Sequence, residues 1–257
     1  MNKLAQVFEK KAFIPFITCG DPDLATTEAI IDELTKAGAD LIELGIPFSD
    51  PTAEGPTIQE ANLRALKHQI TTDDVFQLVK KVRRTNSVPL AIMTYANIVF
   101  TYGAEKFFAR MQELAITALI LADVPYEEKA EFLEDAQKYG VSLISFVAPT
   151  SNDRIEMIAK EAEGFIYIVS SLGVTGTRSE ITTDLAPIVE SIRKVSKTPC
   201  AIGFGISSPE QAAKMAKLAD GVIVGSAIVK LIAKYGKGAP AKVGEFVRQL
   251  KDAISKV

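Results

Sequence analysis

The chain has 257 residues, of which 47% are hydrophobic and 24% are charged, so it holds enough apolar side chains for a sizeable core. Its 29 basic and 32 acidic residues give a net charge of -3, and without a basic surplus we expect no nucleic-acid partner. No apolar run approaches the roughly 20 residues of a membrane span, and the first residues lack a secretory signal. These features predict a cytoplasmic protein that does not bind membranes.

Residue types that hold metals or act as nucleophiles are scarce. Cys19 and Cys200 are too few and too far apart for a disulfide framework or a Cys-rich metal site, and His68 is the only histidine. We therefore expect no metal, no nucleophilic role for Cys19, and a solvated His68 near the end of a helix.

Short runs of apolar and β-branched residues recur along the chain. They predict eight strands, at residues 13–18, 41–45, 89–93, 118–121, 142–147, 165–170, 200–204 and 221–224. The runs are continuous rather than alternating, which is typical of parallel strands that are buried on both faces.

The segments between these strands have helical spacing. In residues 26–37, for example, Ile30, Leu34 and Ala37 share one face and Gly38 follows as a stop signal. We predict the other helices at residues 4–10, 73–84, 126–139, 152–162, 185–195, 209–217, 226–235 and 241–256.

Strands that alternate with helices pair in parallel through right-handed crossovers. Eight such units in about 250 residues match a (β/α)8 TIM barrel, here with an extra N-terminal and C-terminal helix and with residues 1–257 as a single domain. A doubly wound open sheet is the alternative, but residues 18–22 after the first strand do not form its glycine-rich fingerprint.

Catalytic groups of such barrels lie at the carboxyl ends of the strands. Glu43 lies within a strand, and alternation places it on the same face as Leu41 and Gly45. If this face points into the barrel, burial raises the pKa of Glu43 and suits it to proton transfer. The alternative is a strand-end carboxylate that contacts solvent or a neighbouring Lys or Arg.

The loop after this strand, residues 46–57, contains three prolines and the acids Asp50 and Glu54. Two carboxylates that approach one substrate from different elements are common in acid–base catalysis. The alternative is a rigid surface loop with solvated acids.

Glycine-rich turns follow the last three predicted strands, at residues 173–176, 203–209 and 225–227. Glycine lets backbone N–H groups approach an anion, and barrels often bind phosphate after strands seven and eight. The turns thus favour a phosphorylated substrate, although Ser226 alone could simply be an N-cap.

The chain resembles the tryptophan synthase alpha subunit family along nearly its whole length. The resemblance is most specific at residues 43–51, 55–59, 95–97, 122–125, 173–176 and 203–211. It implies a lyase that cleaves indole-3-glycerol phosphate into indole and glyceraldehyde 3-phosphate by a retro-aldol reaction.

The resemblance also implies roles for individual residues. Glu43 would be the proton-shuttling glutamate and Glu54 would accept the indole N–H hydrogen. The remaining positions fall into four groups: Phe16 and Tyr167 in the indole pocket, Thr175 and Gly176 on a lid, Phe204, Gly205, Gly225 and Ser226 around the phosphate, and Asp50, Pro51 and Asn97 at the contact with a partner.

That partner is a beta subunit in an allosteric α2β2 heterotetramer, which receives the indole through a tunnel. The beta subunit holds pyridoxal phosphate, and the resemblance implies no cofactor for this chain.

One position departs from the family pattern, which has aspartate where this chain has Glu54. The extra methylene moves the carboxylate by about an ångström, and such a misplacement can cost on the order of a hundredfold in rate. We expect Glu54 to take the proton with low activity in the absence of the partner.

Three alternatives remain at this stage. One is a catalytically weakened subunit that acts mainly as an allosteric activator of the beta subunit. Another is a different phosphate-binding barrel, which the proline-rich segment 43–59 disfavours. The last is a lyase of the same chemistry that works without a beta subunit.

Overall fold

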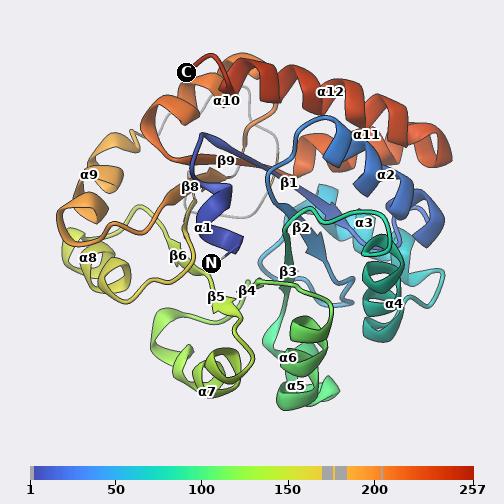
Figure 1. The fold of residues 1–257 in the computed structure, drawn as a ribbon, viewed down its shortest axis with the longest axis horizontal. Helices are drawn as coiled ribbons and strands as arrows, with labels where there is room; N and C mark the ends of the chain where they lie inside the picture. The colour runs from blue at the N-terminus through green and yellow to red at the C-terminus, as the bar shows by residue number, and fades with distance from the viewer. Residues whose placement is uncertain (1–2, 170–175, 177–183, 204) are drawn as a thin grey trace.

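The computed structural model describes residues 3–169, 176, 184–203 and 205–257. Within these residues, nine strand segments form one parallel sheet in the order β5-β4-β3-β2-β1-β9-β8-β7-β6, around which the helices are arranged (Figure 1). The segments are β1 (Ala12–Thr18), β2 (Ile42–Gly45), β3 (Leu90–Thr94), β4 (Ala118–Leu121), β5 (Ser142–Leu143), β6 (Ser145–Val147), β7 (Ile166–Val169), β8 (Cys200–Gly203) and β9 (Gly221–Val224). This is the predicted (β/α)8 barrel.

The barrel has nine segments rather than eight because the fifth predicted strand is divided at Ile144. β5 pairs with β4 and β6 pairs with β7, so the two ends of the sheet order are neighbours in the chain. In β4, only Ala118 and Leu119 pair with the fifth strand, opposite Ser142 and Leu143 of β5. We call the place between β4 and β6 the seam of the barrel.

Helices surround the strands, with α7 and α8 on the two sides of β5 and β6 (Figure 1). They are α1 (Lys3–Val7), α2 (Leu24–Lys36), α3 (Pro56–Leu66), α4 (Thr72–Val82), α5 (Ala96–Tyr102), α6 (Ala104–Glu113), α7 (Ala130–Lys138), α8 (Asn152–Lys160), α9 (Ala186–Val195), α10 (Pro209–Leu218), α11 (Ser226–Tyr235) and α12 (Ala239–Ile254). The 3-10 turns η1 (Tyr126–Glu128) and η2 (Gly236–Gly238) precede α7 and α12. Within the described residues, no helix is long and apolar enough to span a membrane.

Several helix boundaries differ from the sequence prediction. The predicted loop 46–57 overlaps the start of α3, because Pro56 is suited to a first helical turn. The predicted helix 126–139 is divided into η1 and α7. The two helices α5 and α6 occupy a stretch for which no helix was predicted, and they meet at Gly103, whose φ of 91° ends one helix before the other begins.

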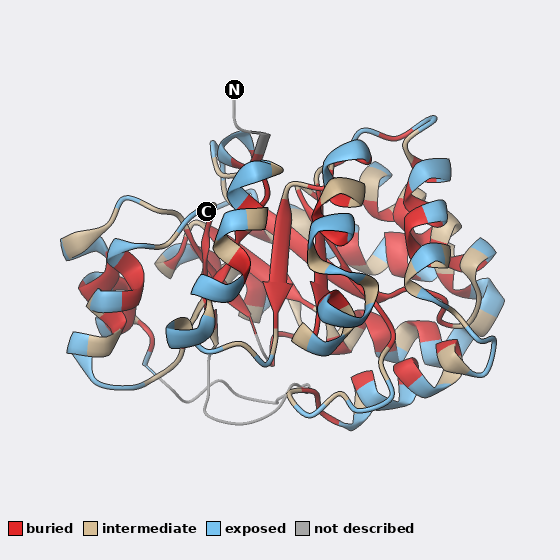
Figure 2. Cartoon of the chain, turned by 90° about the horizontal axis from the view of Figure 1, so that it is seen from below, coloured by how far each residue is buried: buried red, intermediate tan, exposed pale blue. Residues whose placement is uncertain are grey.

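The core has two layers because strand residues alternate between the barrel interior and the surrounding helices. Leu41, Met93 and Ile223 belong to the inner cluster, whereas Ile42 and Leu44 pack in the outer one. Figure 2 shows the buried strands at the centre and the exposed outer faces of the helices. This alternation turns the next inner position of β2, Glu43, toward the barrel interior.

Candidate active site

Glu43 is completely buried in β2 and faces the barrel interior. Among the described residues, neither of its carboxyl oxygens has a hydrogen-bond partner, and no ion pair includes it. Burial, together with the negative charge of Glu54, raises the pKa of Glu43 well above its usual range. Glu43 therefore has the inward orientation that its role in proton transfer requires. The alternative, a strand-end carboxylate that contacts solvent or a neighbouring Lys or Arg, is wrong.

Glu54 reaches the same space from the loop between β2 and α3, and only 4% of it is exposed. Two hydrogen bonds hold this loop: the Ala53 N–H donates to Tyr95 Oη over 3.2 Å, and Gln59 Nε2 donates to the Glu54 carbonyl over 2.8 Å. The alternative of solvated loop acids is thus wrong for Glu54 and correct for Asp50, which is exposed.

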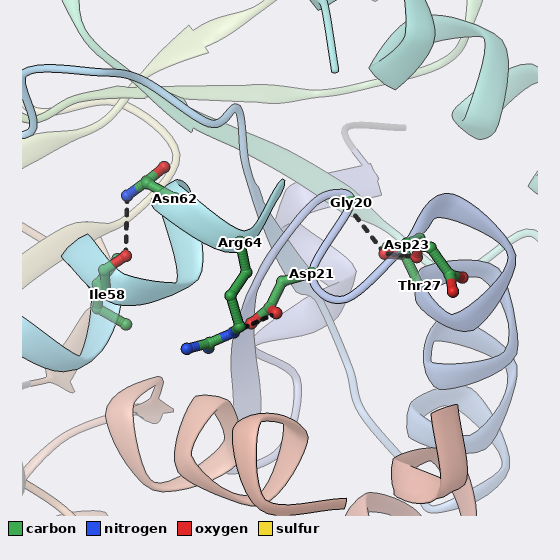
Figure 3. Close-up of polar contacts among 7 residues, drawn as sticks. All are labelled: Gly20, Asp21, Asp23, Thr27, Ile58, Asn62 and Arg64. Atoms are coloured by element: carbon green, nitrogen blue, oxygen red, sulfur yellow. Dashed lines mark hydrogen bonds and ion pairs between the residues drawn. The ribbon is translucent and has the colours of Figure 1, made fainter. Parts of the chain in front are cut away.

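Polar contacts of α3 hold this helix against the loops around it. Figure 3 shows the ion pair between Arg64 and Asp21 and the bond within the helix from Asn62 to Ile58. The Asn62 side chain accepts from the Phe48 N–H and donates to the Ile58 carbonyl, both over 3.0 Å. Arg64 forms a two-pronged ion pair with Asp21 in the turn after β1, at 2.7 and 2.8 Å. The helix that follows Glu54 is therefore fixed to two separate turns at the carboxyl ends of the strands.

The predicted residues converge on one space, which we call the Glu43 cavity. Its walls include Phe16, Glu43, Glu54, Tyr167, Gly176, Gly205, Gly225 and Ser226, all of them predicted. Thr175 and Phe204 lie outside the described residues. The unfilled volume is about 30 Å³, which is enough to hold a water molecule.

Tyr167 closes one side of this cavity. It is buried on β7, its ring centroid lies 4.9 Å from that of Phe146, and burial with the nearby charges of Glu43 and Glu54 raises the pKa of its hydroxyl. A Cβ at Gly203 would lie 2.5 Å from Tyr167 Oη. The ring can occupy this place only because residue 203 has no side chain.

The first turn of α11 also borders this cavity. The helix starts at Ser226 with Gly225 as the N-cap, and no side chain caps it. The alternative that Ser226 is an N-cap is therefore wrong. Gly225 and Ser226, at the N-terminus of this helix, both border the Glu43 cavity, an arrangement that favours an anionic group of a ligand.

The three predicted partner-contact residues do not line this cavity. Asp50 and Asn97 are exposed and Pro51 is partly exposed. The N-terminus of α5, next to Asn97, is held by a 2.9 Å hydrogen bond from the Ala96 N–H to Asp123.

The remaining candidates of the sequence have no part in the site. Cys19 is buried, which raises the pKa of its thiol to about 12 and keeps it protonated, and His68 is exposed just after α3. No cluster of His, Cys, Asp and Glu that could hold a metal occurs in the described part of the chain.

Four apolar wall residues were not predicted: Ile58, Met93, Ile206 and Ile223. Met93 and Ile223 occupy inward positions of β3 and β9, so strand alternation, once the barrel is assumed, could have identified them. Ile58 comes from α3, whose start was read as loop.

Comparisons with known proteins agree with this geometry. The family model described as tryptophan synthase alpha chain matches residues 3–255. The tryptophan synthase alpha chain of Lacticaseibacillus casei is 49% identical over 255 residues, which cover 99% of this chain and 96% of that one. That of Lactiplantibacillus plantarum is also 49% identical, over 256 residues that cover 99% and 97%.

Solved structures are similar as well. The alpha chain of Legionella pneumophila superposes with a TM-score of 0.88 at 36% identity and covers 100% of this chain and 98% of its own. A chain of the tryptophan synthase α2β2 complex of Pyrococcus furiosus has a TM-score of 0.86 at 34% identity, covering 94% and 98%. Since both the family model and these relatives extend over nearly the entire chain, it belongs to the tryptophan synthase alpha chain family.

Proposed function

We propose that this chain cleaves indole-3-glycerol phosphate into indole and glyceraldehyde 3-phosphate, a step of tryptophan biosynthesis, with residues 1–257 acting as one domain. The observation that carries the proposal is the pair of buried carboxyl groups in one cavity. Glu43 is held as a neutral acid by its raised pKa, and Glu54 is positioned by the loop that precedes α3.

Glu43 and Glu54 divide the proton transfers between them. Glu43 donates its proton to C3 of the indole ring while Glu54 accepts the proton of the ring N–H. Glu43, now a carboxylate, takes the proton of the glycerol hydroxyl next to the bond to be broken. The carbon–carbon bond then breaks, its electrons return to the ring, and Glu54 returns the proton to the ring nitrogen.

The other wall residues orient the substrate. Phe16 and Tyr167 contact the indole ring, and Gly176 borders the same cavity. Gly205, Gly225 and Ser226 bind the phosphate through backbone N–H groups and the α11 N-terminus.

The chain acts together with a beta subunit. Asp50, Pro51 and Asn97 lie outside the Glu43 cavity, and in this proposal they contact that partner. The Pyrococcus furiosus relative comes from an α2β2 complex. This chain needs no cofactor, because its proton transfers use carboxyl groups alone, and pyridoxal phosphate is held by the beta subunit.

The decisive experiment measures indole release from indole-3-glycerol phosphate by the wild-type chain and by Glu43→Gln, with and without a beta subunit. We expect release by the wild type, stimulation by the partner, and a loss of at least about a thousandfold in Glu43→Gln, since the general acid is removed. Stimulation of the beta subunit without any indole release identifies the chain as an activator instead.

A second variant tests the departure at Glu54. If the longer side chain limits the isolated chain, Glu54→Asp releases indole faster than the wild type. An unchanged or lower rate in Glu54→Asp shows that the surrounding loop already accommodates glutamate.

A further inference from the structure

A small polar pocket adjoins the Glu43 cavity at Glu54, which borders both spaces. Its unfilled volume is about 10 Å³, close to the minimum of about 10–15 Å³ that one water molecule needs. Four other polar residues border it, from the ends of β1 and β3, from α3 and from the start of the turn after β3: Thr18, Thr94, Asn62 and Tyr95. We call it the Thr18 pocket.

The hydroxyl group of Thr18 is buried beside this pocket. Thr18 is the last residue of β1 and is only 2% exposed. Alternation places it on the inward face with Phe16, since Ile17 packs in the outer layer of the core. Its hydroxyl oxygen, like that of Thr94, has no hydrogen-bond partner among the described residues. Because burying an unpaired hydroxyl group is costly, we look for its partner inside the pocket.

Two of the other polar side chains narrow the choice of that partner. The Asn62 side chain is already bonded to two backbone groups. The Tyr95 hydroxyl accepts from the Ala53 N–H over 3.2 Å and still has its own proton to donate. Burial and then the negative charge of Glu54 raise the pKa of Tyr95, so this hydroxyl stays protonated. The carboxylate of Glu54 is thus the acceptor that the hydroxyl groups of the pocket share.

We propose that Thr18 is a positioning residue for Glu54, which it holds through one water molecule bound in the Thr18 pocket. The Thr18 hydroxyl donates to this water, and the water donates to the Glu54 carboxylate. The water fits the pocket because it finds several polar partners there: Thr18, Tyr95 and Glu54. Hydrogen bonds donated to a carboxylate favour its ionised form, so Thr18 keeps Glu54 ready to accept a proton. In this last point the inference rests on the proposed function, where Glu54 is the base.

NMR titration of the Glu54 carboxyl carbon tests this contact without using activity. Its signal is identified by its loss in Glu54→Gln. In Thr18→Val a methyl group replaces the hydroxyl, and we expect Glu54 to titrate about one pH unit higher than in the wild type. Thr18→Ser restores the hydroxyl and should titrate like the wild type. An unchanged titration in Thr18→Val overturns the proposal, as does a Thr18→Ser chain that behaves like Thr18→Val.

Thr117→Val is the matched control. Thr117, just before β4, also has a buried hydroxyl oxygen without a partner within the described part of the chain. It borders neither the Glu43 cavity nor the Thr18 pocket, so the titration of Glu54 should stay as in the wild type. An equal shift in the two valine variants reflects the general loss of a buried hydroxyl and contradicts a specific role of Thr18.

A high-resolution crystal structure of the wild type tests the water itself. We expect one ordered water within hydrogen-bond distance of Thr18 Oγ1 and of a carboxylate oxygen of Glu54. A structure in which no water joins these two groups overturns the proposal.

Indole release separates this inference from the proposed function. In Thr18→Val we expect kcat to fall about tenfold with KM little changed, since one hydrogen bond to a charged group is lost. A wild-type chain that releases no indole refutes the proposed function, whereas the titration of Glu54 and the crystal structure still decide whether Thr18 holds it.

Discussion

The carboxyl groups of Glu43 and Glu54 come from a strand and from the loop that follows it, and both border the same small cavity. The charge of Glu54 adds to burial in raising the pKa of Glu43. Two carboxyl groups so close cannot both ionise easily, so each one's proton affinity depends on the state of the other. The pair is therefore suited to hold one proton near neutral pH.

Neutralising Glu54 should lower the pKa of Glu43. In Glu54→Gln the like charge is absent and only burial remains as a cause of the upward shift. The carboxyl carbon of Glu43, followed by NMR as a function of pH, should titrate at lower pH than in the wild type. Asp50→Asn, which removes an exposed acid of the same loop, is the control and should leave the titration in place; identical curves for all three proteins contradict the coupling.

Glu43→Gln should be more stable than the wild type, by an amount that grows with pH. Because the pKa of Glu43 is raised on folding, the native chain binds its proton more tightly than the unfolded chain. The wild type then loses about 1.4 kcal/mol of stability per pH unit above the ordinary glutamate pKa, until the native pKa is reached. Urea unfolding at pH 5 and pH 8 measures this difference, and a constant gap between the two proteins argues against a raised native pKa.

Gly203→Ala should displace Tyr167 and impair the site. The added Cβ would lie 2.5 Å from the Tyr167 hydroxyl and 2.6 Å from a ring carbon, so the ring must move by an ångström or so. We expect kcat/KM for indole release to fall on the order of a hundredfold, as misplaced substrate-positioning groups commonly cause. Gly238→Ala, where a Cβ meets nothing within 4 Å, should retain full activity.

Removing Arg64 should destabilise the chain more than removing the charge of Asp21. The Asp21 side chain is only 1% exposed while that of Arg64 is 27% exposed, so Arg64→Met leaves a buried carboxylate without its partner. We expect a loss of about 3 kcal/mol in the free energy of unfolding and a smaller loss in Asp21→Asn. The double variant should lie close to Asp21→Asn; additive losses in the three urea curves rule out the asymmetry.

Strand positions follow closely from the sequence because each strand is a continuous apolar run between helical segments. All eight runs contain a strand of the barrel, with end shifts of one residue in most cases. The division at Ile144 could not be predicted, since Ile144 is itself apolar and no Gly or Pro interrupts the run 142–147. It depends on which neighbour each half pairs with, and that is decided only when the barrel closes.

The candidate site was predictable where a residue conflicts with its surroundings. Glu43 is an acid in an apolar strand, and this conflict alone indicated a function. Glu54 looked like an ordinary loop acid, and only the family resemblance assigned it to the site.

β1 and β9, the first and last strands of the barrel, pair with each other. The walls around Glu43 accordingly include residues from both, from Phe16 of β1 to Ser226 just after β9. During synthesis, a ribosome-bound chain that has not yet released β9 therefore leaves the Glu43 side chain in water, with the acidity of any free glutamate. The raised pKa of Glu43 therefore requires the docking of β9. We expect a chain that is terminated before β9 to be inactive.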